Sequence, residues 1–154
     1  MRESHHNLAK EKIISMGQQC ACYNLRKASR TITRLYDEFL KPSGIHATQL
    51  SILLGTKILQ PVTMNRLAKS SMMNRTTLSR NLKPLEKKEL VRVAPGQDRR
   101  ERIVKLTDRG EDVLAHAYPL WEDAQNTVIS GLHQEGLDAL LKSLSDVVRL
   151  TRSR

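Results

Sequence analysis

The chain has 154 residues and carries 26 lysines and arginines against 16 acidic residues, a formal net charge of +10. This length suits one domain with a buried core, and the charge indicates an anionic partner, either nucleic acid or a charged membrane surface. The aromatic content of 3% argues against a module that stacks single-stranded bases on aromatic side chains. No apolar run of about 20 residues is present and no apolar stretch lies near the start, so we expect neither a membrane span nor a secretory signal, and a cytoplasmic location.

The first half of the chain is predicted to be helical. Apolar residues recur at helical spacing over about residues 16–41, which predicts one long amphipathic helix that ends at Pro42. We expect Thr48 to cap a second helix that ends at Gln60. Thr63 is expected to cap a short third helix, and Asn74 a fourth that runs to about Glu89.

After about Glu89, the spacing of apolar residues changes from a helical period to a strict alternation. Val91 and Val93 flank Arg92, and a similar alternation precedes Thr107, with a turn cluster of Pro95, Gly96, Gln97 and Asp98 between them. This pattern predicts a two-stranded hairpin with a charged tip. Thr107 and Asp108 are expected to start a further helix, with a kink at Pro119.

A last helix is expected after Gly131, and it carries an apolar seam of Leu137, Leu140, Leu141, Leu144 and Val148. The first and last helices have apolar stripes that they must bury against each other or against a second copy of the chain. We therefore expect a homodimer.

A short helix, a turn, a second helix and a basic hairpin over about residues 63–107 form the layout of a winged helix-turn-helix. We predict a mainly α fold with a small β-hairpin wing and long terminal dimerisation helices. The expected division is an N-terminal arm and dimerisation helix (about 1–47), the winged helix-turn-helix DNA-binding domain (about 48–107) and C-terminal dimerisation helices (about 108–154).

The positive charge is concentrated in this middle segment, since residues 63–110 hold thirteen Lys and Arg against five Asp and Glu, a net charge of +8. In the helix after Asn74, three leucines share one face, and Thr76, Arg80 and Lys83 lie almost opposite. Arginine binds guanine, threonine contacts a thymine methyl group or a phosphate, and lysine neutralises the DNA backbone. Arginines of the hairpin suit a narrow minor groove. The expected DNA-binding residues are Arg75, Thr76, Thr77, Arg80, Asn81 and Lys83 in the helix and Arg99, Arg100 and Arg102 in the hairpin.

Other interpretations of these features remain open. Any surface helix has a polar outer face, and a charged turn is often simply solvated. A non-specific or architectural DNA-binding protein is therefore the alternative to a sequence-specific regulator.

Four stretches resemble the signature of MarR-family regulators: Thr76-Thr77-Leu78-Ser79-Arg80, the run from Leu85 to Arg92, Asp98-Arg99-Arg100, and the run from Val104 to Gly110. The resemblance implies a homodimer joined through its terminal helices on a pseudo-palindromic operator. It also implies recognition helices in the major grooves, wings in the minor grooves, and release by a small ligand or by oxidation. The family usually has glycine where this chain has Glu89, so we expect Glu89 to adopt a cap geometry that glycine takes more cheaply.

The two cysteines are candidates for oxidation sensing. Cys22 falls where the organic-peroxide-sensing branch of the family has its reactive cysteine, and Tyr36 matches one of that branch's two tyrosines. Arg26, one helical turn after Cys22, would favour the thiolate. Cys20 and Cys22 would point to nearly opposite faces of a continuous helix, so a bond between them needs local unwinding. The alternative is that both are small packing residues.

A small-molecule effector is the other mode of release that the resemblance implies. The expected cleft lies between the first, second and fifth helices, near Tyr36, His46 and Trp121, although such aromatic residues are more often core. The five histidines lack metal-ligand spacing, and Cys22 has no matched base for a thiol enzyme. We expect no metal, no cofactor and no enzymatic activity.

Overall fold

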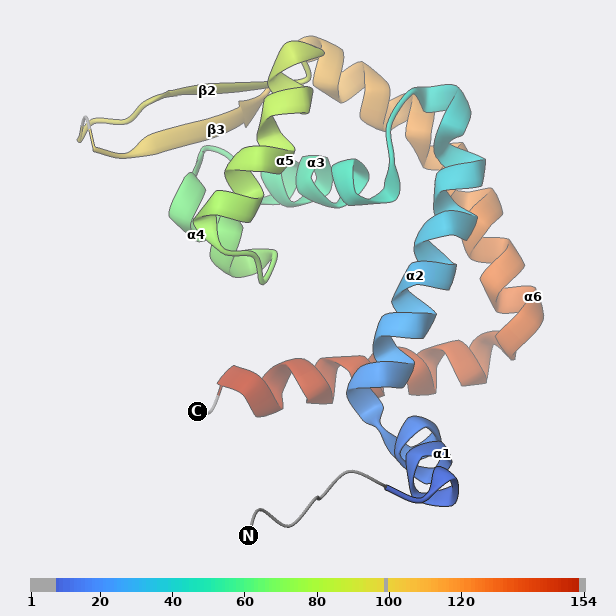
Figure 1. Ribbon diagram of the computed structural model, residues 1–154. Helices are drawn as coiled ribbons and strands as arrows, with labels where there is room; N and C mark the ends of the chain where they lie inside the picture. Colours follow the sequence, from blue (N-terminus) through green and yellow to red (C-terminus); the bar gives the residue numbers. More distant parts are fainter. Residues whose placement is uncertain (1–7, 99, 153–154) are drawn as a thin grey trace, which may run out of the picture. The chain divides into compact units, whose positions relative to one another are not determined.

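The computed structural model describes residues 8–98 and 100–152 (Figure 1). The first residues of the expected N-terminal arm and Arg99 of the expected wing lie outside these described ranges. The fold is mainly helical with one small antiparallel sheet, as the sequence predicts. Backbone contacts divide the chain into two compact units, one that ends at Leu35 and one that begins at Tyr36. No helix in the described ranges is long and apolar enough to span a bilayer.

The N-terminal helix is interrupted, so the prediction of one helix over residues 16–41 is wrong. Helix α1 (Lys10–Gln19) and helix α2 (Ala21–Leu40) are separated by Cys20, whose backbone is extended at φ −71° and ψ 107°. The apolar period runs on across this residue, which is why periodicity alone gives no sign of the break.

Side chains close both helix ends at this joint. The Asn24 side-chain amide nitrogen lies 3.1 Å from the carbonyl oxygens of both Gly17 and Gln18, in the last turn of α1, and 3.0 Å from that of Cys20. The Tyr23 backbone N–H donates to the Cys20 Sγ at 3.4 Å. Cys20 therefore occupies the N-cap position of α2, where serine or aspartate is the usual residue.

Helix α3 (Ala47–Leu59) follows a short 3-10 turn, Lys41–Ser43, and begins two residues earlier than predicted. The N-cap is His46, not Thr48. The Asp37 carboxylate accepts the Ala47 N–H at 2.7 Å, and the Gln49 side chain accepts the His46 N–H at 3.1 Å. An acceptor from the preceding helix thus replaces the hydroxyl cap that local sequence favoured.

The next two helices have the predicted caps. Helix α4 (Met64–Ser70) is capped by the Thr63 hydroxyl, which accepts the Arg66 N–H at 3.2 Å. Helix α5 (Arg75–Lys87) is capped by the Asn74 side chain, which accepts the Thr77 N–H at 2.7 Å. These local hydrogen bonds satisfy orphan donors of the first turns.

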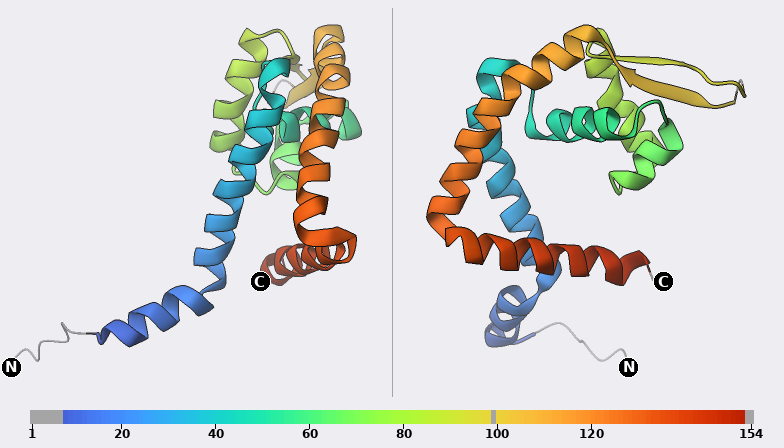
Figure 2. Two further views of the ribbon diagram at one scale, coloured as in Figure 1. Left: turned by 90° about the vertical axis from the view of Figure 1, so that its right-hand side faces the viewer. Right: turned by 180° about the vertical axis from the view of Figure 1, so that it is seen from behind.

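The predicted hairpin is confirmed and is joined by a third strand. Strands β2 (Val91–Pro95) and β3 (Arg102–Leu106) pair antiparallel, and β1 (Val62–Thr63) pairs with the other edge of β3. Strand β1 was not predicted, because two residues carry no detectable alternation. Helices α3 and α4 pack against β3, and the view from behind (Figure 2, right) shows them beneath the hairpin.

Helix α6 (Asp108–Arg152) begins as predicted, with the Thr107 hydroxyl accepting the Gly110 N–H at 3.0 Å. Its one residue with non-helical dihedral angles is His133, at φ 59° and ψ 160°. This break fits the separate last helix expected after Gly131. A bend at Pro119, which lies inside the helical stretch, stays a prediction.

One hydrophobic core holds the second unit together. It joins the end of α2, helices α3 to α5, all three strands and the start of α6. Leu53, Leu67, Leu78, Leu85 and Val104 are all fully buried. This core fixes the orientation of α5 and the hairpin, the two elements that the sequence predicts to touch DNA.

Candidate nucleic-acid interface

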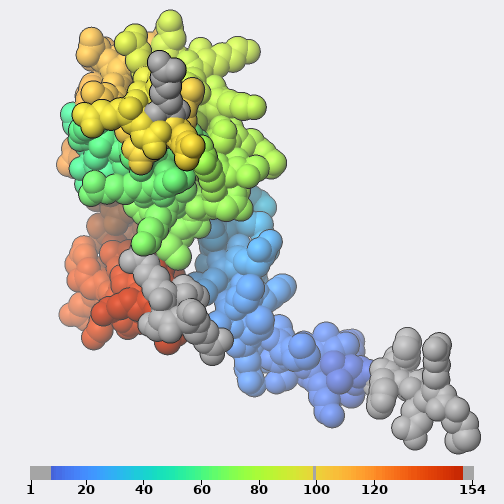
Figure 3. Space-filling model, turned by 90° about the vertical axis from the view of Figure 1, so that its left-hand side faces the viewer, coloured from blue at the N-terminus to red at the C-terminus, as the bar shows by residue number. Residues whose placement is uncertain are grey.

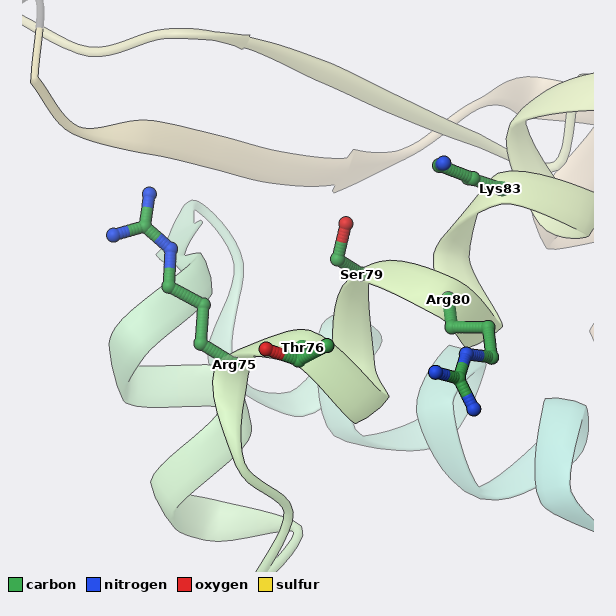
Figure 4. Close-up of a pocket in the computed structure, with 5 residues that line it drawn as sticks. All are labelled: Arg75, Thr76, Ser79, Arg80 and Lys83. Atoms are coloured by element: carbon green, nitrogen blue, oxygen red, sulfur yellow. The ribbon is translucent and has the colours of Figure 1, made fainter.

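The outer face of α5 is polar and basic. Leu78, Leu82 and Leu85 turn inward and are at most 1% exposed, so the opposite side of the helix faces solvent. A shallow depression of about 460 Å³ runs along that side, lined by Arg75, Thr76, Ser79, Arg80 and Lys83 (Figure 4). Four of these five residues are among the expected DNA-binding residues.

The side chains of this face point two ways. In Figure 4, Arg75 and Ser79 point to the side on which the hairpin runs, and Arg80 points away from it. Ser79 is the residue that the sequence analysis missed, although it lies four residues from both Arg75 and Lys83 and therefore on their side of the helix. The depression thus offers guanidinium groups in two directions and a hydroxyl group between them.

Thr77 and Asn81 do not line this depression. The Asn81 side-chain amide donates to the Thr77 carbonyl oxygen at 2.9 Å, and Asn81 is half-buried on the flank nearer the core. Of the six residues expected to bind DNA in this helix, the structure brings four together and leaves these two to one side.

The tip of the wing is held by its own backbone. The Asp98 carboxylate accepts the Arg100 N–H at 2.9 Å, and the Asp98 carbonyl accepts the Glu101 N–H at 2.9 Å. Within the described residues no ion pair involves Arg100 or Arg102, and both are exposed. No described carboxylate therefore holds either of these two wing arginines in an ion pair.

A second groove, of about 340 Å³, lies between α5 and the wing. Its apolar floor is Met64, Leu82 and Val93, and its charged and polar walls are Arg75, Ser79, Lys83, Glu86 and Arg102. Arg102 reaches this groove because it lies two residues from the buried Val104, and alternate residues of a strand share one face. Arg75, Ser79 and Lys83 line both hollows.

The basic elements share one side of the second unit. Figure 3 looks onto that side and shows the hairpin in yellow, with the green α4 below it and the yellow-green α5 beside it. The whole segment from residue 63 to 110 has the net charge of +8 noted above. A helix and a hairpin that project together from a basic surface match the two grooves of a duplex.

The root of the wing is tied to its neighbours. Glu89 has φ 58°, which confirms the glycine-like geometry expected of it. Its carbonyl oxygen accepts the Thr107 hydroxyl at 2.5 Å, and its carboxylate pairs with Arg109 at 3.1 Å. A β-carbon at Gly110 would lie 2.1 Å from the Leu90 carbonyl oxygen, so only glycine permits this approach of α6 to β2.

The residues expected around a small-molecule effector all have structural partners. The half-buried Tyr36 hydroxyl donates to the Gln125 side chain, and burial raises the pKa of Tyr36 above its ordinary value. Trp121 packs against the core beside Tyr118, at 6.0 Å between ring centroids. The imidazole of His46 lies 3.8 Å from the Asp37 carboxylate and is 71% exposed.

The two cysteines are free thiols and both are exposed. Exposure argues against the packing role within the described chain. The extended backbone at Cys20 provides the local unwinding that a continuous helix would have lacked. Arg26 lies on α2 one turn after Cys22, as expected. Among the described residues no three His, Cys, Asp or Glu side chains cluster as metal ligands.

Known proteins are similar to this chain in sequence or in fold. The MarR family model matches residues 43–101. The transcriptional regulator MosR of M. tuberculosis, solved in complex with DNA, is 35% identical, with a TM-score of 0.76 over 87% of this chain and 99% of the MosR chain.

Two HTH-type transcriptional regulators of Bacillus subtilis are also similar. YwoH is 28% identical over 89 residues, which span 58% of this chain and 65% of YwoH, slightly less than two thirds of that protein. YwaE is 28% identical over 130 residues, which span 82% of this chain and 76% of YwaE. The family consists of transcriptional regulators rather than enzymes. From the basic face, the winged fold and the match along nearly all of MosR, it follows that the chain belongs to the MarR family.

Proposed function

We propose that the protein is a sequence-specific transcriptional repressor that binds a pseudo-palindromic operator as a homodimer. The observation that carries this proposal is the single basic face on which α5 and the wing lie together (Figure 3). Arg80 and Thr76 would contact base edges in the major groove, Arg100 at the tip of the wing would enter the flanking minor groove, and Arg102 would bind the DNA backbone. The DNA complex of MosR supports the same partner for this chain.

The proposed division of labour follows the chain. Residues 48–107 would bind DNA, and residues 1–47 and 108–154 would join the two copies. A repressor of this kind acts on chromosomal DNA, which in a bacterial cell lies in the cytoplasm.

Exposed apolar side chains support the homodimer. Beyond His133, α6 leaves Leu140, Leu141, Leu144 and Val148 between 37% and 51% exposed, at the spacing of one helix face. Helix α1 leaves Ile13, Ile14 and Met16 about half exposed or more. A second copy is the natural occupant, because a pseudo-palindrome is read by two protomers related by a two-fold axis. Sedimentation should give a dimer at micromolar concentration, and a 17.5 kDa species there would refute it.

Release from the operator would follow oxidation of Cys22 or binding of a small ligand. In the first mode the Cys22 thiolate attacks an organic hydroperoxide, which gives a sulfenic acid and an alcohol. The Cys20 thiol, the other subunit or a small thiol then displaces water to form a disulfide. If hydroperoxide weakens operator binding of the parent but not of Cys22→Ser, oxidation is the signal. Equal responses would leave the small ligand as the effector.

Selection of bound fragments from random DNA tests the central claim. The purified protein should enrich a pseudo-palindromic sequence and bind it at least about 1000-fold more tightly than random duplex at one stated salt concentration. Equal affinity for both duplexes would favour the architectural DNA-binding alternative.

Two variants of α5 test its assignment as the recognition helix. Arg80→Ala should reduce discrimination at one or two base pairs by about 1–3 kcal/mol, since a base contact is lost. Lys83→Ala should weaken binding to all sequences alike and make the salt slope shallower by about one unit, since a phosphate contact is lost. An unchanged base preference in Arg80→Ala would show that α5 does not read the operator.

A further inference from the structure

The groove between α5 and the wing gathers like charges from separate elements. Arg75 and Lys83 come from α5, and Arg102 comes from the first position of β3. At about 100° per residue, Arg75, Ser79, Lys83 and Glu86 lie within one quarter of the circumference of α5, on one flank. Figure 4 shows Arg75 and Ser79 of this flank directed to the hairpin side.

This arrangement has the chemistry of a phosphate site. Guanidinium and ammonium groups bind phosphate oxygens through charge-assisted hydrogen bonds, and a serine hydroxyl adds a neutral donor. The groove is open along one side, so a chain of phosphates can pass through it. It lies between the two elements proposed to enter neighbouring grooves of the duplex, where the DNA backbone must run.

Glu86 also lines this groove, and its negative charge is unexpected in a phosphate site because it repels phosphate. It is exposed, it is the one carboxylate that lines the groove, and within the described residues it takes part in no ion pair. A carboxylate about 6 Å from a phosphate opposes binding by about 1 kcal/mol at an effective dielectric constant between those of protein and water. Its side chain is not part of the hydrophobic core.

We propose that Arg75, Ser79, Lys83 and Arg102 bind one DNA backbone phosphate in this groove, and that Glu86 limits the strength of that contact. The inference rests on the proposed function, because it requires a duplex on the basic face. Backbone contacts supply nearly all of non-specific affinity. A repulsive carboxylate beside the backbone therefore keeps the protein from being held by DNA that lacks the operator.

The test compares Glu86→Gln with the parent on random duplex and on a selected operator fragment, between about 50 and about 200 mM salt. Glu86→Gln should bind random duplex about 3- to 10-fold more tightly at the lower salt concentration, and its salt dependence should be steeper by up to about one unit. Glu86→Asp keeps the charge and should stay close to the parent. Asp112→Asn, an exposed position on α6, is the matched control and should have no effect.

The outcomes separate the two proposals. If the parent binds neither duplex, or binds both equally, the proposed function fails and this inference falls with it. If the parent prefers the operator but Glu86→Gln binds random duplex no more tightly than the parent, the inference alone is overturned. If Glu86→Gln changes the base preference at one position of the operator, the inference is also overturned, because the carboxylate would then contact a base. Circular dichroism melting of each variant confirms that folded proteins are compared.

Discussion

The two ends of the wing are built differently. At the root, Gly110 lets α6 approach the Leu90 carbonyl, the Glu89 carbonyl accepts the Thr107 hydroxyl, and the Gln60 side chain accepts the Leu106 N–H at 3.0 Å. At the tip, the hydrogen bonds are local and the described arginines have no ion pair. The contrast indicates that the root sets the direction of the wing, while the tip is free to adjust its charges to a ligand.

The largest effect is expected at the root, from Gly110→Ala. The added β-carbon would lie 2.1 Å from the Leu90 carbonyl oxygen, so the start of α6 must move away from β2. We expect a loss of about 3 kcal/mol in the free energy of unfolding, measured by urea denaturation. Gly131→Ala is the control, because nothing lies within 4 Å of its added β-carbon. Equal stability of the two variants would contradict the close approach.

A smaller loss is expected from Gln60→Ala. This change leaves the half-buried Leu106 N–H without its acceptor, and Gln60 also lies 3.5 Å from Glu111, which pairs with Lys57 at 2.7 Å. An unsatisfied buried donor costs about 1–3 kcal/mol, so we expect a loss in the lower part of that range. The exposed Gln97 near the tip is the matched position. Gln97→Ala should change stability by less than about 0.5 kcal/mol.

The tip should affect binding and not folding. Arg100→Ala should leave the unfolding transition unchanged and weaken operator binding by about 1 kcal/mol when the flanking sequence is A·T-rich, because a narrow minor groove attracts arginine. Binding assays on operators with A·T-rich and G·C-rich flanks make the comparison. An equal loss of affinity for the two operators would contradict the assignment of Arg100 to the minor groove.

The smallest effect is a gain in stability at the root. Glu89 has φ 58°, a conformation that glycine adopts without strain. Glu89→Gly should stabilise the protein by about 0.5–1 kcal/mol, because the lost ion pair with Arg109 is exposed and contributes little. Chemical denaturation measures the change. A net loss of stability would show that the ion pair outweighs the strain.

Local signals made the fold largely predictable. The caps at Thr63, Asn74 and Thr107 were predicted because each depends on a side chain within three residues of the donor it satisfies. The break at Cys20 was not, because it depends on Asn24 reaching back to carbonyl groups and on a sulfur acceptor that is rare at helix starts. Strand β1 exists only through its pairing with the distant β3.

In the candidate site, too, some residues could be predicted from local sequence and others depend on the tertiary structure. Arg75, Thr76, Arg80 and Lys83 were predictable from the period of one helix, and the structure gathers them in one depression. The groove that joins Arg102 and Glu86 depends on the placement of the wing beside α5, which only the core determines.

Helix α1 buries no residue of its own, and its ten residues are fewer than an isolated helix needs to be stable in water. Asn24 anchors its last turn, whereas Ile13 and Ile14, nearer its start, are about half exposed. The order of α1 therefore depends on what covers those side chains. If the second copy does so, slow amide hydrogen exchange in α1 should appear only above the dimer dissociation constant, which would make this helix an internal reporter of assembly.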